Sequence, residues 1–206
     1  MEDFSYIGKL LENSLYLLAL LNPASKVMFL STYEPPLSRR QVVELSWKSS
    51  LAALLILIVL AAAGEVVLRK VFKVELYSLR ITGGLILFMI GWMAVREGRF
   101  VQKQEHKLRE DFTELSLVPL AAPLIAGPGT IAAAISGTAE YGLTMTASAL
   151  TLAISVNFVL MLFSRPINRI LERTHLLGPL IRLTGLIIAA VSVQMVITGI
   201  RECIGA

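Results

Sequence analysis

Residues 118–131 have the sequence VPLAAPLIAGPGTI, an apolar run that contains three prolines and two glycines. Proline has no backbone N–H group and disfavours helical geometry in the residue before it. An unsatisfied backbone group in lipid is costly, so such interruptions persist in a membrane only where they are buried in protein or line a cavity. The run therefore predicts a transmembrane helix that is interrupted at Gly127-Pro128-Gly129-Thr130.

The rest of the chain has the composition of a helical membrane protein. Hydrophobic residues make up 55% and charged residues 17% of the 206 residues, whereas soluble domains carry about 25% charged residues. A membrane-spanning helix needs about 20 predominantly apolar residues. Six such segments are expected, at residues 10–30, 45–68, 76–95, 115–137, 143–163 and 177–200. The sequence predicts an all-α, multi-pass membrane protein with six transmembrane helices and no separate soluble domain.

Lysine and arginine residues are distributed unevenly between the two sides of the expected helices. Six lie on the side that holds both termini, and twelve lie on the opposite side. Cytoplasmic loops of membrane proteins carry the excess of positive charge. We therefore expect a protein of the cell (inner) membrane with both termini outside the cytoplasm. The charged segment 96–114 would then be a cytoplasmic linker.

Two short motifs occur twice, in the same order. Arg80-Ile81-Thr82-Gly83 is echoed 102 residues later by Arg182-Leu183-Thr184-Gly185, and Asn22-Pro23-Ala24-Ser25 corresponds to Gly127-Pro128-Gly129-Thr130. The halves 1–95 and 115–206 each hold three expected spans, so the second half must enter the membrane from the opposite side. The pattern predicts two inverted three-helix repeats whose first helices, helices one and four of the chain, are discontinuous. This architecture recurs in secondary transporters.

The two interruptions offer complementary binding chemistry. The helix that starts after each break presents free N–H groups and a partial positive charge, which suit a carboxylate. The helix that ends there leaves free carbonyls, which suit an ammonium group or a cation. Alternatively, the prolines only kink the helices. The predicted substrate-binding residues are Asn22, Pro23, Ala24, Ser25, Gly127, Pro128, Gly129 and Thr130.

Three further polar residues within expected spans are additional candidates. Lys26 could approach a substrate carboxylate, or it could extend to the headgroups from the cytoplasmic end of its helix. Asn157 and Gln194 could contact a substrate, or they could form hydrogen bonds that hold neighbouring helices together.

Other function classes find little support in the composition. One cysteine and two histidines give no metal-type cluster, and no paired carboxylates or nucleophile sets lie in the spans, so no enzyme, metal or cofactor is expected. The net charge of +4 resides in loops rather than on a nucleic-acid-binding surface. Membrane lipids and a small solute are the expected partners. The coupling ion, H⁺ or Na⁺, and the oligomeric state stay open.

Four segments resemble the MarC family of prokaryotic inner-membrane proteins. They are Asn22-Pro23, residues 79–86 (LRITGGLI), residues 118–131 and Arg182-Leu183-Thr184-Gly185. The family is grouped with amino-acid exporters of the lysine-exporter type, so the resemblance implies transport of small neutral amino acids such as glycine and alanine. Many relatives have Gly-Asn after Asn-Pro, whereas this chain has Ala24-Ser25-Lys26, which leaves the substrate identity open.

Together these features predict a secondary transporter, importing or exporting, that works by alternating access around a midplane site. The alternative is a structural or regulatory membrane subunit that transports nothing. Transport by the purified protein distinguishes the two.

Overall fold

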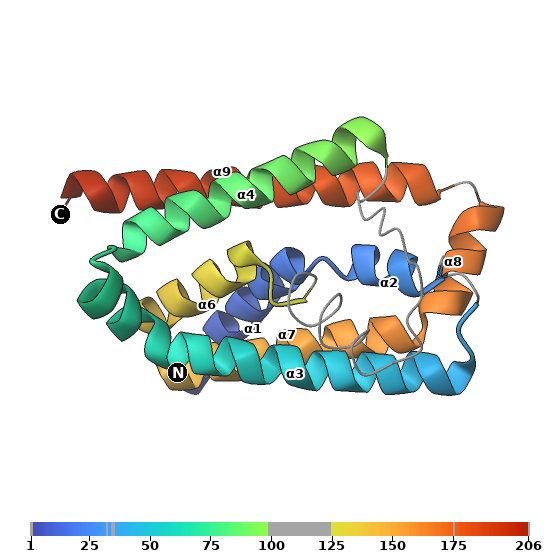
Figure 1. Ribbon diagram of the computed structural model, residues 1–206, viewed down its shortest axis with the longest axis horizontal. Coiled ribbons are helices and arrows are strands. Elements are labelled where there is room, and N and C mark those ends of the chain that lie inside the picture. The colour runs from blue at the N-terminus through green and yellow to red at the C-terminus, as the bar shows by residue number, and fades with distance from the viewer. Residues whose placement is uncertain (1, 32, 34–35, 99–124, 175, 206) are drawn as a thin grey trace.

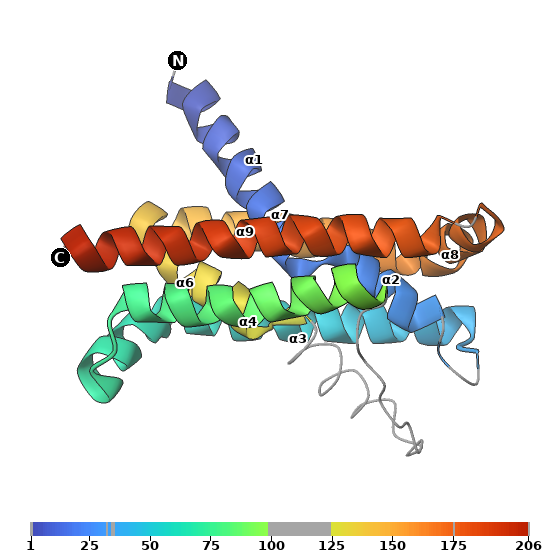
Figure 2. The same cartoon turned by 90° about the horizontal axis from the view of Figure 1, so that it is seen from above.

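The computed structural model describes residues 2–31, 33, 36–98, 125–174 and 176–205. All regular structure in these residues is helical, and the long helices α3, α4, α7 and α9 run along one common axis (Figures 1 and 2). The helices are α1 (Glu2–Leu21), α2 (Pro23–Ser31), α3 (Arg39–Val66), η1 (Val67–Phe72), α4 (Leu76–Glu97), α6 (Pro128–Tyr141), α7 (Leu143–Leu162), α8 (Ser164–Arg173) and α9 (Leu177–Gly205).

The described helices include four that are long and apolar enough to cross a membrane. They are the continuous helix Arg39–Phe72 together with α4, α7 and α9, and α1 with α2 forms a fifth candidate that is bent by 41°. The all-α membrane fold predicted from the sequence is therefore confirmed. The predicted fourth span begins in residues 115–124, which lie outside the described residues, as do Pro119, Pro123 and most of the charged linker.

Local sequence signals explain where α3 begins and ends. The Ser38 hydroxyl accepts a hydrogen bond from the Gln41 backbone N–H at 3.2 Å, and Oε1 of Gln41 accepts one from the Ser38 backbone N–H at 2.7 Å. This reciprocal capping satisfies two backbone donors at the helix start. At the other end α3 continues as the π-helical segment η1 until Lys73, whose φ of 56° turns the chain back towards α4.

Helices α4 and α9 pack side by side in opposite directions through a seam of small residues (Figures 1 and 2). A Cβ atom placed on Gly91 would lie 2.7 Å from the Gly185 carbonyl oxygen, and one on Gly199 would lie 2.9 Å from the Tyr77 carbonyl oxygen. Such close backbone approach requires glycine, and it is a common means of packing helices in membranes. Gly83, Gly84 and Gly185 likewise permit close helix packing, since a Cβ atom on each would lie within 3 Å of a neighbouring helix.

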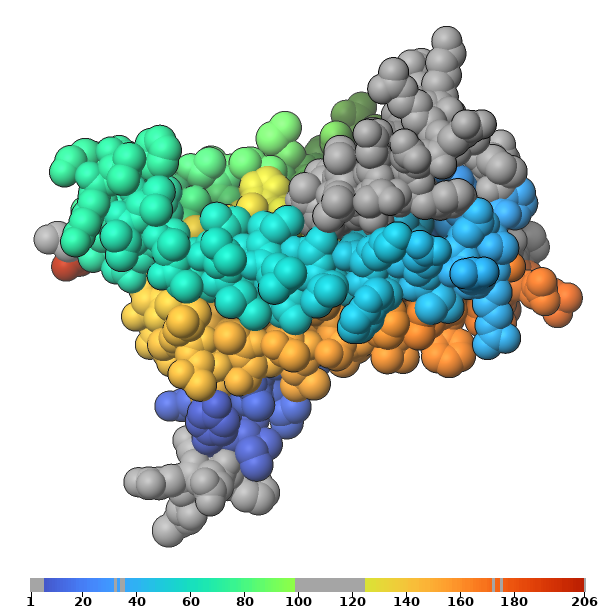
Figure 3. Space-filling model, turned by 60° about the horizontal axis from the view of Figure 1, so that its bottom comes forward, coloured from blue at the N-terminus to red at the C-terminus, as the bar shows by residue number. Residues whose placement is uncertain are grey.

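The other helices form the main core. Figure 3 shows α3 and α7 packed along one face, while the first part of α1 projects away from the bundle, as Figure 2 also shows. Small and branched apolar side chains from α1, α3, α6 and α7 fill the space between these helices, including Leu21, Leu57, Ala132, Ala149 and Leu150. Large apolar side chains stay exposed on the outer faces, as expected for helices that contact lipid.

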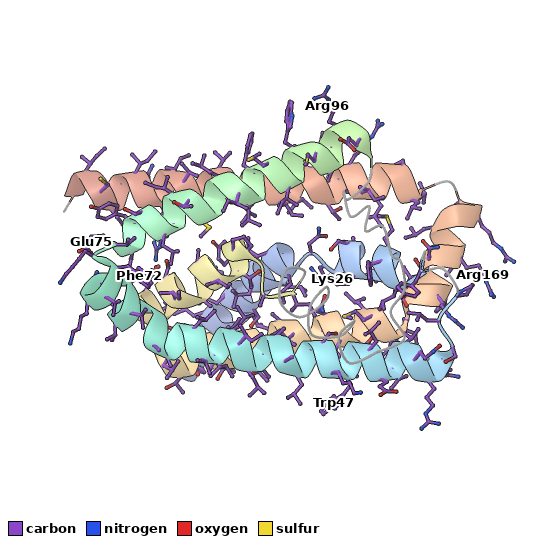
Figure 4. All side chains as sticks on the ribbon, in the orientation of Figure 1. Lys26, Trp47, Phe72, Glu75, Arg96 and Arg169 are labelled. Carbon is purple, nitrogen blue, oxygen red and sulfur yellow. The ribbon has the colours of Figure 1, made fainter. Side chains whose placement is uncertain are left out.

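The two ends of the bundle differ in charge and in the segments they hold. Both chain termini lie toward one end, the left in Figure 1. The opposite end holds the short helix α8, which lies across the long axis and was not among the helices predicted from the sequence. Arg165, Arg169 and Arg173 recur every four residues on α8, so they share one face, and all three are exposed. Figure 4 shows Arg169 at this end and Phe72 and Glu75 at the other.

Candidate functional site

The first proline motif separates two helices within the bundle. Helix α1 ends at Leu21 and α2 starts at Pro23, with Asn22 between them at a φ of 50°. Asparagine tolerates this left-handed conformation better than most residues do. Pro23 occupies the first helical position, where its missing N–H group costs nothing. Asn22 also ends α1, because its backbone N–H donates to the carbonyls of Leu18 and Ala19.

Lys26 fills the carbonyl end of this break. In a continuous helix the amide of Ser25 would donate to the Leu21 carbonyl, but here it donates to the Asn22 carbonyl at 3.2 Å. The Leu21 carbonyl instead accepts a hydrogen bond from Nζ of Lys26. Lys26 is only 2% exposed, and Figure 4 shows it among the helices in the middle part of the bundle. The alternative in which Lys26 extends to the headgroups is wrong for this conformation.

The outer side of the same break faces α9. Asn22, Pro23 and Ala24 line a largely apolar pocket of about 260 Å³ together with Thr184 and Ile188 of α9. The Ser25 hydroxyl donates to the Asn22 carbonyl at 2.9 Å, so it is engaged within the break. This half of the predicted site is thus assembled as a compact turn.

The second motif starts helix α6. Gly127 is the N-cap residue with ordinary extended geometry, and Pro128 again occupies the first helical position. A Cβ atom on Gly129 would meet the Leu87 side chain at 2.0 Å, so this glycine lets α6 pack closely against α4. Thr130 is buried. The second motif therefore packs on α4 while the first faces α9, and a pocket shared by the two motifs stays a prediction.

A pocket of about 360 Å³ opens where α4 begins and α6 ends, and it is named the polar pocket after the charged side chains in its lining. It lies between α1, α4, α6, α7 and α9 and is lined by Glu12, Asn13, Tyr16, Leu17, Arg80, Ala133, Ser136, Gly137, Glu140, Tyr141, Thr146, Ala149, Gln194, Met195 and Thr198. Of the residues predicted from the sequence, it contains Gln194. The other lining residues could not be grouped from the sequence, because they come from five separate helices.

In the polar pocket, Arg80 is paired with two carboxylates. Its guanidinium group forms ion pairs with Glu140 of α6, at 3.0 Å, and with Glu202 of α9. The Arg80 side chain is 12% exposed, whereas the two carboxylates are about half exposed. A hydrogen bond from the Tyr141 hydroxyl to Glu140 raises the pKa of Tyr141 to about 12. The repeated Arg-x-Thr-Gly motif was the one sequence signal that pointed to Arg80.

Two buried hydroxyl groups line the pocket without a hydrogen-bond partner among the described residues. They are Oγ of Ser136 and Oγ1 of Thr146. Buried polar atoms are normally hydrogen-bonded, so such atoms beside a cavity suit a polar ligand or water. The pocket thus combines a cation, carboxylates and free hydroxyl groups.

The inner wall of the polar pocket approaches both proline motifs. Leu17 precedes Asn22 by five residues on α1, a rise of about 7.5 Å, and Ala133 follows Thr130 by three residues on α6, a rise of about 4.5 Å. The pocket therefore extends between α1 and α6 to within about one and a half helical turns of each motif.

Asn157 lies away from this pocket. It is fully buried on α7, and its side-chain amide donates to Sδ of Met161 at 3.2 Å on the same helix. Its carbonyl oxygen has no hydrogen-bond partner in the described part of the chain. A hydrogen bond to another helix, which one interpretation of Asn157 predicted, is therefore not formed among these residues.

Comparison with known proteins identifies the family. Residues 7–204 match the model of the MarC family of integral membrane proteins. A UPF0056 membrane protein of Pyrococcus horikoshii is 34% identical over 94% of each chain, and one of Methanocaldococcus jannaschii is 31% identical over 89% of this chain and 91% of its own. The membrane protein YvbG of Bacillus subtilis is 28% identical over 90% of each. No solved structure matches the chain. With the apolar helices described above, these matches show that the chain belongs to the MarC family of integral membrane proteins.

Proposed function

We propose that this protein is a secondary transporter of small neutral amino acids, such as glycine or alanine, that works by alternating access. The observation that carries the proposal is the polar pocket, which enters the bundle beside Arg80 and approaches both proline motifs. A path for solutes through a membrane protein needs such polar groups facing the interior of the bundle. The family match agrees with a membrane role.

The charges of the pocket suit a zwitterion. Arg80 can bind a carboxylate, while Glu140 and Glu12 can bind an ammonium group. The hydroxyl groups of Ser136 and Thr146, which also line the pocket, supply neutral hydrogen-bonding groups. A volume of about 360 Å³ is at the small end of ligand pockets, which favours small solutes with a few water molecules.

The proposed architecture is six spans in two inverted repeats, 1–95 and 115–206. It is supported by α4 and α9, the last helices of the two halves, which pack in opposite directions. It is also supported by α2 and α6, which both start with proline at the first helical position. In this arrangement residues 22–25 and 127–130 form the substrate site near the midplane, and the rearrangement between the halves exposes it to either side in turn.

The proposed orientation places the protein in the cell membrane with both termini outside the cytoplasm. The excess of basic residues at the α8 end supports this choice. The polar pocket near the opposite end would then be the outward vestibule. Arg80, Glu140 and Glu202 would be an ion-pair gate across α4, α6 and α9 that changes partners during transport.

Counterflow tests this proposal. Purified protein is reconstituted into liposomes loaded with unlabelled glycine, and labelled glycine or alanine is added outside. We expect transient accumulation of label that excess unlabelled alanine abolishes and that leucine or a dipeptide leaves unchanged. If folded protein accumulates no more label of any small solute than empty liposomes do, the chain is a structural or regulatory subunit and the proposal is wrong.

A further inference from the structure

The amino group of Lys26 lies where a helix interruption creates a position for a cation. The Leu21 carbonyl is deprived of its helical donor, because the Ser25 amide turns to the Asn22 carbonyl instead. The C-terminal end of α1 also carries the partial negative charge of the helix dipole. A positive group is favoured at this position on both counts, and Nζ of Lys26 occupies it.

The surroundings of Lys26 make this position a binding site rather than a surface contact. The whole side chain is 2% exposed, and in the described part of the chain its amino group forms no ion pair. Burying a positive group without a carboxylate is costly unless backbone oxygens stabilise it. The carbonyl end of α1 therefore supplies the stabilisation that a carboxylate supplies elsewhere.

We propose that the end of α1 is a monovalent-cation site that the chain occupies with its own Lys26, and that removing this side chain lets a small free cation bind there. The site itself rests on the geometry of the helix break. The consequence for ion coupling rests on the proposed transport. Since Lys26 occupies the site, no Na⁺ ion is needed at this break, and the transport rate should be equal in sodium chloride and in choline chloride.

Lys26→Ala gives the most direct test because the missing atoms can be added back. The substitution removes three carbon atoms and one nitrogen, which is the composition of n-propylammonium. Thermal unfolding of the purified full-length protein is measured in choline chloride, in sodium chloride and in n-propylammonium chloride at equal ionic strength. At about five times its dissociation constant, a bound cation should raise the Tm of Lys26→Ala by about 2–4 °C.

Three comparisons control the experiment. The unchanged protein should not respond, since its site is filled. Lys26→Met should not respond, since its side chain fills the same space without a charge. Lys48→Ala removes an exposed lysine that pairs with Glu44 on the surface, so it should behave like the unchanged protein.

The outcomes decide the proposal whether or not the protein transports anything. A Tm increase confined to Lys26→Ala, in either Na⁺ or n-propylammonium, supports a cation site, and the two salts distinguish a metal ion from an ammonium ligand. If Lys26→Ala is folded and responds to neither cation, or if the unchanged protein responds as strongly, the proposal is wrong. If Lys26→Ala folds poorly in choline, recovery of monodisperse, folded protein only in n-propylammonium supports the site. Failure to recover folded protein in either cation then contradicts it.

Discussion

Replacing Gly91 by alanine should destabilise the protein through the seam between α4 and α9. The new Cβ atom would lie 2.7 Å from both the Ala189 amide nitrogen and the Gly185 carbonyl oxygen. These distances are 0.7 Å shorter than the 3.4 Å at which ordinary contact begins. Both atoms belong to helix backbone and cannot turn aside as a side chain can. The helices must therefore separate, and packing is lost along the seam.

The size of the effect follows from a matched control. Gly8→Ala also replaces a glycine inside a helix, but its Cβ would meet no atom within 4 Å. Both substitutions share the gain of about 1 kcal/mol in helix propensity, so their difference isolates the steric cost. Overpacking of this kind costs about 1–3 kcal/mol. At about 2–4 °C per kcal/mol for a chain of this size, Gly91→Ala should unfold several degrees below Gly8→Ala.

Thermal unfolding in detergent, followed by circular dichroism, measures the difference directly. Measuring both variants in one detergent and at one protein concentration removes effects of solvent and oligomerisation. Should Gly91→Ala unfold at or above the temperature of Gly8→Ala, the close approach of α4 and α9 described above would be refuted.

Four more substitutions have defined outcomes. Asn22→Ala should lower the free energy of unfolding by about 1–2 kcal/mol, because alanine disfavours a φ of 50°. Asn22→Gly should keep the Tm of the unchanged protein within about 1 °C. Equal Tm values for the two variants would refute the left-handed turn. Arg80→Gln should abolish glycine counterflow and lower the free energy of unfolding by about 1–2 kcal/mol. The control Arg201→Gln, one residue from Glu202, should do neither. Unchanged counterflow in Arg80→Gln would show that Arg80 does not lie on the path of the solute. Ser136→Ala should leave the Tm unchanged, because its hydroxyl has no partner among the described residues, yet weaken alanine competition in counterflow; a large loss of Tm would contradict the unpartnered hydroxyl. Gly129→Leu should lose stability as well as transport, since its side chain would occupy the position of Leu87, and a wild-type Tm would contradict that packing.

The positions of the spanning helices could be predicted because the membrane requirement concerns one continuous segment of the sequence at a time. Segments of about 20 apolar residues must form helices in lipid, and α4, α7 and α9 begin at or within one residue of the predicted positions. The helix starts at Pro23 and Pro128 were also predictable, since proline is favoured at the first position of a helix. Helix α8 was missed because its charged residues suggested a loop, although arginines every four residues indicate an amphipathic helix.

The polar pocket was not predictable because it depends on how distant segments pack. Glu12, Arg80, Glu140 and Gln194 come from four helices, and no local pattern relates them. The role of Lys26 depends on a similar detail, namely which carbonyl loses its donor at the break. The upstream half of the predicted fourth helix lies outside the described residues, so its break stays a prediction.

Substrate protection of a cysteine placed at the break tests the central claim most directly. Ser25→Cys adds a thiol between Asn22 and Lys26, and the native, exposed Cys203 at the end of α9 serves as an internal control in the same molecule. Alkylation rates of the two thiols are measured by peptide mass spectrometry, with and without saturating alanine in proteoliposomes. We predict that alanine slows alkylation at position 25 several-fold and leaves Cys203 unchanged. Equal rates at position 25 with and without alanine, in protein that still performs counterflow, would contradict a substrate site at the interrupted helix.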